Sequence, residues 1–379
     1  MLIAMLPASF KRLTRRSFLR DTSLAAAWLA WMQRARAADA PKPGDAPPAK
    51  RLGVVLAGLG RYATGQLRPA LQQTQFCKLV GVVTRRPDVG AQWAKDCGFS
   101  AKNVYNYDTM AKMADNADID VVYVVTPNGL HAGHVAAAAK AGKHVICEKP
   151  MANSVAECDA MIAACRDAKR TLSIGYRIHF DPYHQELMRL AQGDFAPFTK
   201  MAGEFCFVMG AHEWRIEKKL SGGGPLVDIG IYSFHEACLA ANANPIAVTA
   251  KEIPKKRPDF FTEVEEGIEW TMEFPGGATA QCRASYNENA NHCRAEGAKG
   301  WIDLSPAFSY SGLKGSTSRG SLSFPPINQQ AKHMDAIAQA ILEKKDSPVP
   351  GELGRRDMVI MAGIYESAKT GKRVELKFI

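Results

Sequence analysis

Short apolar runs alternate with helix-like stretches through the part of the chain that follows residue 51. Runs of strand type cover 52–57, 79–83, 119–125, 144–147 and 172–175, and helical stretches cover 130–141 and 154–168. Continuous apolar runs are typical of strands buried on both faces, and strands that alternate with helices favour a parallel sheet. The pattern predicts an α/β domain over residues 51–176.

The pattern changes in the second half of the chain. Segments of strand type at 200–209, 246–254, 265–274 and 278–286 follow one another without long helices between them, and helical stretches at about 331–344 and 354–370 end the chain. Strands grouped in this way, with helices after them, predict a second domain of the α+β class over 177–379.

The first 50 residues have a different composition. A twin-arginine core at 14–20 precedes an apolar run at 24–32 and a small-residue stretch at 35–38. The run is too short to span a bilayer, so the order predicts a twin-arginine signal peptide over 1–37 and a periplasmic location. The alternative is a basic amphipathic N-terminal helix. Residues 38–50 are rich in proline, which predicts an extended arm rather than a helix.

Charge, cysteine content and histidine spacing argue against a nucleic-acid partner, a disulfide framework and a metal site. The chain of 379 residues has a formal charge of +10, of which residues 1–37 carry +6 and the rest +4. The basic excess therefore indicates an export signal, and without a basic stripe we expect no nucleic-acid partner. Nine cysteines without a C-x-x-C pair and histidines without an H-E-x-x-H motif indicate neither a disulfide framework nor a metal site.

A glycine pattern follows the first predicted strand. Gly58, Gly60 and Ala63 match G-x-G-x-x-A, in which the first glycine permits the tight turn, the second lets the backbone approach a pyrophosphate, and the alanine lets helix and strand pack closely. The alternative is an ordinary glycine turn. We assign the whole loop to a predicted dinucleotide site, with Leu59, Arg61 and Tyr62 included.

The end of the second predicted strand indicates which dinucleotide binds. Thr84-Arg85-Arg86 stands where such folds place a carboxylate on the ribose 2′-hydroxyl. Two guanidinium groups favour a 2′-phosphate instead, so the sequence predicts NADP rather than NAD. The alternative is a solvated basic loop. Thr126 and Glu148 follow later strands, and ligands of such sheets lie beyond these carboxyl ends.

Longer motifs extend this prediction to a family. With Thr126-Pro-Asn-Gly-Leu-His131, Glu148-Lys-Pro150 and Gly222-Gly-Gly-Pro-Leu-Val-Asp-Ile-Gly-Ile-Tyr232, the chain from about residue 51 to its end resembles the Gfo/Idh/MocA oxidoreductases, and among them the exported glucose-fructose oxidoreductase branch. The resemblance implies a Rossmann domain, an open, mostly antiparallel sheet, sugar substrates, a tightly held NADP and a homo-oligomer formed through that sheet. It adds these cofactor or substrate contacts: Tyr107, Pro127, Asn128, His131, Arg177, Trp214, Arg215 and Tyr310.

The same resemblance points to the residues that react. Hydride transfer at a sugar needs a proton acceptor, and Tyr232 is our candidate. A phenol is a weak base unless a cation favours its phenolate, and Lys149, whose peptide to Pro150 is cis in the family, is the expected cation. Asp228, four residues before Tyr232, would share its helical face and hold the tyrosine or the substrate.

These residues lead to one functional hypothesis and two alternatives. We expect an enzyme that oxidises an aldose to its lactone and passes the hydride to a second sugar, with NADP(H) recycled in place. The first alternative is a simple sugar or polyol dehydrogenase with an exchangeable cofactor. It is favoured by a segment between Phe205 and Trp214 that is shorter than in the branch, and by the absence of a lysine near Val89. The second alternative is a non-catalytic sensor.

Overall fold

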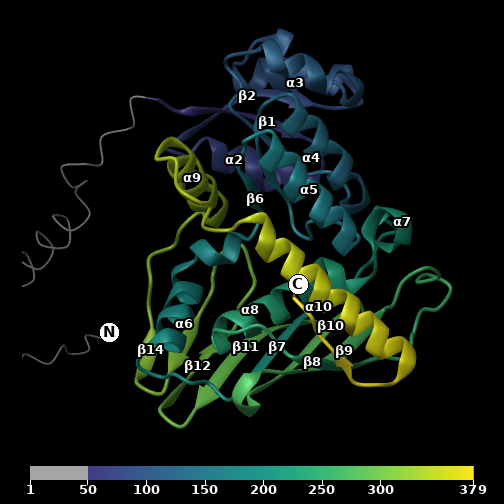
Figure 1. The fold of residues 1–379 in the computed structure, drawn as a ribbon, viewed down its shortest axis with the longest axis vertical. Helices are drawn as coiled ribbons and strands as arrows, with labels where there is room; N and C mark the ends of the chain where they lie inside the picture. Colours follow the sequence, from purple (N-terminus) through teal and green to yellow (C-terminus); the bar gives the residue numbers. More distant parts are fainter. Residues whose placement is uncertain (1–49, 379) are drawn as a thin grey trace, which may run out of the picture. The chain divides into compact units, whose positions relative to one another are not determined.

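Two β-sheets organise residues 50–378, which are the part of the chain that the computed structural model describes (Figure 1). The predicted signal peptide over 1–37 lies outside the described residues, as does the arm up to residue 49. No helix among the described residues is long and apolar enough to cross a membrane.

The first sheet has six parallel strands. Their order is β3-β2-β1-β4-β5-β6, so the chain turns to the opposite side of β1 when it enters β4. The strands are β1 Leu52–Ala57, β2 Cys77–Val83, β3 Val104–Tyr105, β4 Val121–Val124, β5 His144–Cys147 and β6 Leu172–Ile174. Every residue of β1 and β4 is buried, which explains their continuous apolar sequence. A change of direction of this kind leaves a crevice at the carboxyl ends of the strands.

Helices connect the strands of this sheet. They are α2 Arg68–Leu71, α3 Pro87–Cys97, α4 His131–Lys140 and α5 Val155–Asp167. A π-helical turn, Ala63–Leu67, directly precedes α2 and begins at the alanine of the glycine pattern. Such turns are rare and occur frequently at functional sites.

The second sheet has nine strands in the order β14-β13-β12-β11-β7-β10-β9-β8-β15. All neighbouring pairs are antiparallel except β7 with β10. The strands are β7 Lys200–Cys206, β8 Ala247–Glu252, β9 Gly267–Glu273, β10 Thr279–Ser285, β11 Ala290–Gly297, β12 Gly300–Leu304, β13 Gly315–Thr317, β14 Gly320–Leu322 and β15 Val374–Glu375. The predicted fold class, a parallel Rossmann-type sheet with an α+β domain on a mostly antiparallel sheet, is confirmed.

Helices of the second half pack on both sheets. They are α6 Pro182–Gln192, α7 Lys218–Ser221, α8 Ile231–Ala241, α9 Gln329–Leu342 and α10 Gly351–Thr370. Helix α8 packs on β7 and β10, and α10 contacts both β8 and α5, so it joins the two halves (Figure 1).

One prediction about this half is wrong. We expected no long helix between the strands at 200–209 and 246–254, but a π-helical turn, Leu226–Gly230, and α8 lie there. Almost every residue of α8 is buried. A helix that is buried all round has no apolar stripe, and without the stripe its period cannot be recognised in the sequence.

Candidate active site

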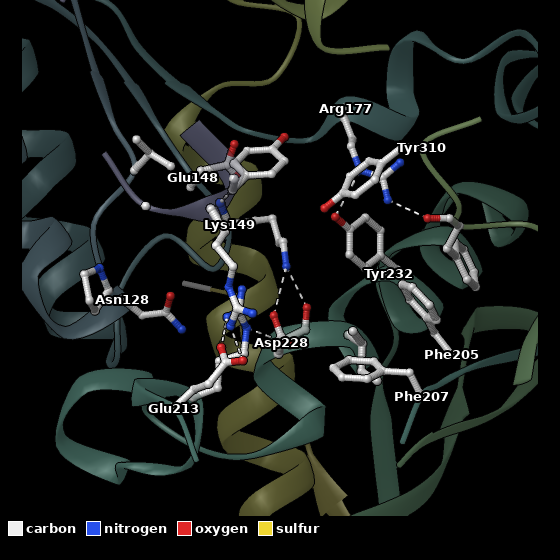
Figure 2. Close-up of a pocket in the computed structure, with 18 of the residues that line it drawn as sticks. Asn128, Glu148, Lys149, Arg177, Phe205, Phe207, Glu213, Asp228, Tyr232 and Tyr310 are labelled. Atoms are coloured by element: carbon white, nitrogen blue, oxygen red, sulfur yellow. Dashed lines mark hydrogen bonds and ion pairs between the residues drawn. The ribbon is translucent and has the colours of Figure 1, made fainter. Parts of the chain in front are cut away.

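A cavity of about 950 Å³ lies between the two halves of the described chain (Figure 2). We call it the large cavity. Many predicted site residues line it: Gly60, Arg61, Tyr62, Ala63, Thr126, Pro127, Asn128, Glu148, Lys149, Arg177, Trp214, Arg215, Asp228, Tyr232 and Tyr310. They come from the carboxyl ends of β1, β4 and β5 and from the second domain. The fold therefore places residues that are far apart in the sequence around one space.

The glycine loop leaves its backbone open to this cavity. Gly58 has φ +106°, and a Cβ there would lie 2.8 Å from the Val125 carbonyl oxygen, so only glycine fits the turn. A Cβ on Gly60 would meet nothing within 4 Å. The backbone at Gly60 can therefore be approached closely by a ligand, as a bound pyrophosphate requires.

A smaller space, which we call the small hollow, adjoins the other side of the glycine loop. Its volume is about 280 Å³, and it is lined by Leu59, Thr84, Arg85, Arg86, Val89, Tyr107 and Leu130. The Arg85 guanidinium lies 5.8 Å from the centre of the Tyr107 ring. Among the described residues no carboxylate lines this space, although Arg86 pairs with the exposed Asp88 at 3.2 Å, and its two guanidinium groups suit a phosphate. Because Leu59 and Gly60 are consecutive and each lines one of the two spaces, a dinucleotide can extend from one to the other.

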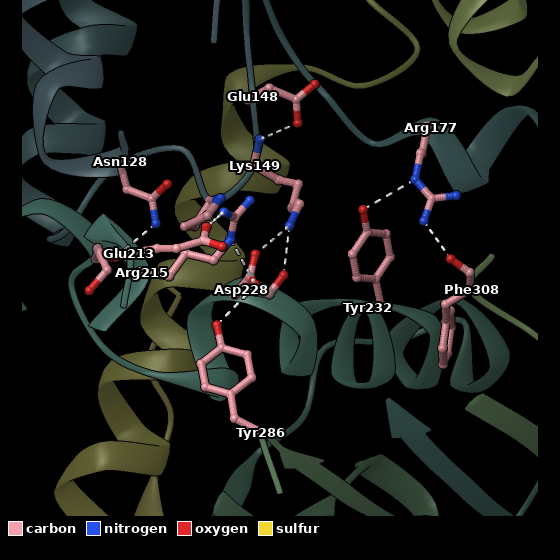
Figure 3. A network of polar contacts seen from close by, with 12 residues as sticks. Asn128, Glu148, Lys149, Arg177, Glu213, Arg215, Asp228, Tyr232, Tyr286 and Phe308 are labelled. Atoms are coloured by element: carbon pink, nitrogen blue, oxygen red, sulfur yellow. Dashed lines mark hydrogen bonds and ion pairs between the residues drawn. The ribbon is translucent and has the colours of Figure 1, made fainter. Parts of the chain in front are cut away.

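Lys149 projects into the large cavity from the end of β5. The Lys149–Pro150 peptide is cis, as the resemblance implies. The Lys149 Nζ donates to the Asp228 carbonyl oxygen at 2.6 Å and lies 3.7 Å from the Asp228 Oδ1 (Figure 3). Both side chains are largely buried, with exposed fractions of 12% and 17%. The charge of the lysine is therefore compensated by the aspartate.

Asp228 belongs to a row of alternating charges. Its Oδ2 accepts from the Arg215 Nε at 3.1 Å and from the Tyr286 hydroxyl at 2.9 Å, and the Arg215 Nη1 lies 2.9 Å from the Glu213 Oε2. Glu213 also pairs with Arg61 of the glycine loop. Burial alone would raise the pKa of Asp228, but the charges of Arg215 and Lys149 and the bonds from Tyr286 and Arg215 hold it below its ordinary value.

The structure corrects the expected link between Asp228 and Tyr232. Asp228 bonds to Arg215 and Tyr286, and it makes no hydrogen bond with Tyr232 among the described residues. The physical reason is that the carboxylate already has other partners, since its Oδ2 accepts from Arg215 and Tyr286 and its Oδ1 lies 3.7 Å from the Lys149 Nζ.

The cation at the Tyr232 hydroxyl is also not the expected one. The Arg177 Nε donates to the Tyr232 hydroxyl at 3.2 Å, whereas the Lys149 Nζ lies over the ring, 4.8 Å from its centre. Tyr232 is the second residue of α8, and Arg177 starts a helical turn after β6. Lys149 is held away from the hydroxyl because its ammonium bonds to Asp228.

Two predicted contacts line neither space. Gly58 forms the turn itself, and His131 is fully buried, with its ring nitrogens 2.8 Å from the Thr126 carbonyl oxygen and 3.0 Å from that of Pro150. Burial lowers the pKa of His131. This histidine therefore ties the ends of β4 and β5 together and does not face a ligand.

Several lining or supporting residues were absent from the sequence prediction. They are Phe205, Phe207, Glu213, Tyr286, Phe308 and Gln329. Phe205 and Phe207 stand two apart at the end of β7, so their alternation was a signal that they share one face. Tyr286 and Gln329 carry no such signal, because their partners Asp228 and Arg177 are distant in the sequence.

Two family models match the chain. One, described as an oxidoreductase family with an NAD-binding Rossmann fold, matches residues 52–176, and the other, the Gfo/Idh/MocA C-terminal domain, matches residues 188–303. The chain belongs to the Gfo/Idh/MocA family. The predicted family and its dinucleotide-binding domain are thereby confirmed.

Three proteins similar to this chain are named as oxidoreductases of sugars. A D-xylose 1-dehydrogenase [NADP(+)] of Haloarcula marismortui is 27% identical over 337 residues, which are 84% of this chain and 91% of that protein. A D-xylose 1-dehydrogenase (NADP(+)) 2 of Haloferax volcanii is 30% identical over 276 residues, 70% of this chain and 83% of the relative. The solved structure of aldose-aldose oxidoreductase from Caulobacter crescentus, complexed with glycerol, is 38% identical, has a TM-score of 0.84, and covers 86% of this chain and 100% of its own.

Proposed function

We propose that this protein is an exported, NADP-dependent sugar oxidoreductase that oxidises an aldose to its lactone and reduces a second sugar while the cofactor stays bound. The observation that carries the proposal is the meeting of the Gly60 backbone, the Lys149 ammonium and the Tyr232 ring at one cavity. An aldose-aldose oxidoreductase that is 38% identical to this chain supports the use of two sugars.

The two spaces fit the parts of NADP. The loop from Gly58 to Ala63 would hold the pyrophosphate against backbone N–H groups, and Arg85 and Arg86 would hold the 2′-phosphate in the small hollow. NADP is favoured over NAD because no carboxylate lines the hollow, and the xylose dehydrogenase relatives carry NADP(+) in their names. When bound, NADP⁺ takes up the hydride, with its two electrons, that leaves the anomeric carbon of the aldose.

The protein supplies the proton chemistry and the orientation of the sugar. The Tyr232 oxygen accepts the proton of the anomeric hydroxyl during oxidation and returns it to the carbonyl oxygen of the second sugar during reduction. The Lys149 ammonium, fixed by Asp228, donates to a sugar oxygen. Phe205 and Phe207 also line the cavity (Figure 2), and they would pack against the apolar face of the sugar ring.

Export makes cofactor retention necessary. The twin-arginine pattern at 14–20 and the small-residue stretch at 35–38 support passage out of the cytosol in a folded state. No pool of free NADP is available there, so turnover requires a cofactor that is reoxidised in place. Two sugars reacting in turn on one cofactor give a ping-pong cycle.

One observation favours a second candidate function. The two xylose 1-dehydrogenases described above both have NADP(+) in their names. A simple aldose dehydrogenase would use the same cavity and the same Tyr232, but its cofactor would exchange with the medium after each oxidation.

The nucleotide content of the exported protein tests the two candidates. The protein is purified from the periplasm, the ligand released on denaturation is identified by mass and absorbance, and the native protein is then titrated with a panel of aldoses. We expect bound NADP that one sugar reduces and another sugar reoxidises. Protein without nucleotide, active only with added NADP⁺, would contradict the closed cycle and favour the simple dehydrogenase.

A further inference from the structure

Arg177 is a buried cation that forms no ion pair with a carboxylate of the described residues. The residue is 3% exposed. Asp228 pairs with Lys149 and Arg215, Glu148 accepts from the Tyr123 hydroxyl at 2.7 Å, and Asp181 accepts from the Gln329 Nε2 at 2.8 Å. A buried charge that is left uncompensated is costly. The function of the buried Arg177 charge is therefore indicated by the groups that the guanidinium contacts.

Neutral acceptors hold the guanidinium in place. The Arg177 Nη2 donates to the Phe308 carbonyl oxygen at 2.5 Å, and the Nη1 donates to the Ser309 carbonyl oxygen at 3.1 Å and to the Gln329 Oε1 (Figure 3). These bonds engage three of the four terminal N–H groups without neutralising the charge. They fix the planar fork, so its position does not depend on the substrate.

The Nε–H of Arg177 is directed at Tyr232. The Nε–H donates to the hydroxyl oxygen at 3.2 Å, and the guanidinium carbon lies 4.8 Å from the Tyr232 ring centre and 4.5 Å from that of Tyr310. Because the oxygen accepts this bond, the O–H proton of Tyr232 must point to another acceptor. Tyr232 lines the large cavity, where a sugar oxygen can be that acceptor.

We propose that Arg177 is the positioning residue of the proton transfer, which directs the Tyr232 O–H into the cavity and stabilises the negative charge on its oxygen. This inference rests on the proposed function. In aldose oxidation the phenolate takes the proton of the anomeric hydroxyl, and the hydride with its two electrons leaves for NADP⁺. In the reduction of the second sugar the hydride stored on the cofactor is returned to the carbonyl carbon, and the phenol gives that proton to the carbonyl oxygen and becomes the phenolate again. Arg177 therefore provides in advance the charge that half of the cycle requires.

Other titratable groups surround the phenol. Lys149, which follows β5, lies over the ring, and Asp228 belongs to the π-helical turn before α8. The charges of Glu148, Tyr310 and Tyr232 act on Tyr62, and those of Tyr232 and Glu148 act on Tyr310. Burial raises the pKa of Tyr62, Tyr310 and Glu148. The two tyrosines therefore stay neutral through the working range of pH, and the Lys149 charge is compensated by Asp228. Arg177 is therefore the cation that bonds directly to the Tyr232 hydroxyl.

The pH dependence of aldose oxidation tests this role in two variants. Oxidation requires the unprotonated oxygen, so its kcat falls on the acid side of the pH profile. Arg177→Gln removes the cation, and we expect the acid limb to move to higher pH by one unit or more, which lowers kcat about tenfold below the limb while KM changes less. Arg177→Lys keeps a cation, and we expect its limb within about half a unit of the wild type.

The outcomes separate this inference from the proposed function. An acid limb that stays in place in Arg177→Gln, or one that moves equally far in Arg177→Lys, overturns the role of Arg177 even if the enzyme is active. A wild type that oxidises no aldose, or a Tyr232→Phe variant with wild-type turnover, instead overturns the proposed function. Bound NADP and the thermal unfolding midpoint are measured for each variant, and Arg177→Met takes the place of the glutamine variant if the latter does not fold, with the same expected shift of the acid limb.

Discussion

At the scale of single residues, Gly58 and Gly60 show how two positions of one motif have different tasks. Gly58 combines φ +106° with a close backbone neighbour, whereas a Cβ on Gly60 would enter open space. The first glycine is therefore required by the fold and the second by the ligand.

Alanine at the two glycines separates folding from cofactor binding. Gly60→Ala is expected to keep the wild-type unfolding midpoint but to lose NADP at least tenfold more readily, because the methyl group occupies the space of the pyrophosphate. Gly58→Ala is expected to lower the free energy of unfolding by about 1–3 kcal/mol through backbone strain. Thermal unfolding and nucleotide content, measured on both proteins, check this. Equal losses of stability in both would contradict the assignment.

Removal of one oxygen atom tests the acid/base residue. Tyr232→Phe keeps the ring against Phe205 and Phe308 but has no hydroxyl to exchange a proton. We expect kcat for aldose oxidation to fall by about 10²–10⁴-fold, with NADP still bound. Steady-state rates and nucleotide content provide the measurement, and Tyr310→Phe is the matched control with a smaller effect. Unaltered turnover in Tyr232→Phe would reject the assignment.

Local sequence predicted those parts of the site that depend on local backbone. The glycine loop and the arginine pair follow their strands directly, so the periodicity of the strands placed Gly60 and Arg85 correctly at the two spaces. The partner of Tyr232 could not be obtained in this way. Arg177 is 55 residues away in the chain, and only the packing of α8 brings the two side chains together.

At the scale of elements, a buried polar cluster joins α8, α10 and the end of β6. Asp357 is fully buried and accepts from the His235 Nδ1 at 2.5 Å, the Tyr176 hydroxyl at 2.6 Å and the Arg356 Nη2 at 2.7 Å. Tyr176 directly precedes Arg177, so this cluster also supports the segment that carries Arg177. Burial opposes the charge of Asp357, but Arg356 and His235 lower its pKa to about 2.

The cluster predicts a pH-dependent contribution to stability. Asp357→Asn leaves Arg356 without its counter-charge, and we expect a loss of about 3 kcal/mol in the free energy of unfolding at neutral pH. Because the folded pKa is lower than the unfolded one, the contribution is present above about pH 4 and is lost as the pH falls towards 2. Denaturant unfolding of both proteins as a function of pH measures it.

The neighbouring ion pair on α10 provides the control. Arg355 pairs with Asp159 of α5, but the Asp159 side chain is 53% exposed. Asp159→Asn should therefore change the free energy of unfolding by less than about 1 kcal/mol. Similar losses in the two variants would contradict the assignment of the stability to the buried cluster.

The prediction of strands succeeded where the apolar sequence was continuous. Five strands of the first sheet were predicted because both of their faces are covered, whereas the two-residue strand β3 was missed. A helical segment was expected at Tyr232, but the length of the buried α8 was missed, since it lacks a polar face, and α6 was missed although it has one. Strands β11 to β14 were also missed, because their outward positions carry polar residues such as His292, Arg294 and Asp303, with turns between short segments.

At the scale of the whole described chain, the two domains meet around the large cavity through polar contacts. The Lys149 Nζ bonds to Asp228, the Asn128 Nδ2 donates to the Ser221 carbonyl oxygen at 2.8 Å, and Arg61 pairs with Glu213. In each case the first residue follows a strand of the parallel sheet and the second belongs to the other domain. The row of charges from Arg61 to Lys149 thus links the glycine loop with the reacting residues (Figure 3).

The link between Arg61 and Glu213 predicts the rate at which cofactor leaves. Arg61 is 79% exposed, so the pair contributes little to stability. It joins two walls of the cavity beside the loop that would hold the pyrophosphate, and opening at this point has to break it. Glu213→Gln is therefore expected to release NADP about three to five times faster, which corresponds to less than about 1 kcal/mol, with an unchanged unfolding midpoint. The release rate is measured by diluting the holoprotein into an excess of labelled NADP.

Glu273→Gln, which breaks the exposed pair with Arg373 away from the cavity, is the matched control. Equal release rates in Glu213→Gln and the wild type would show that the cofactor is retained without this contact.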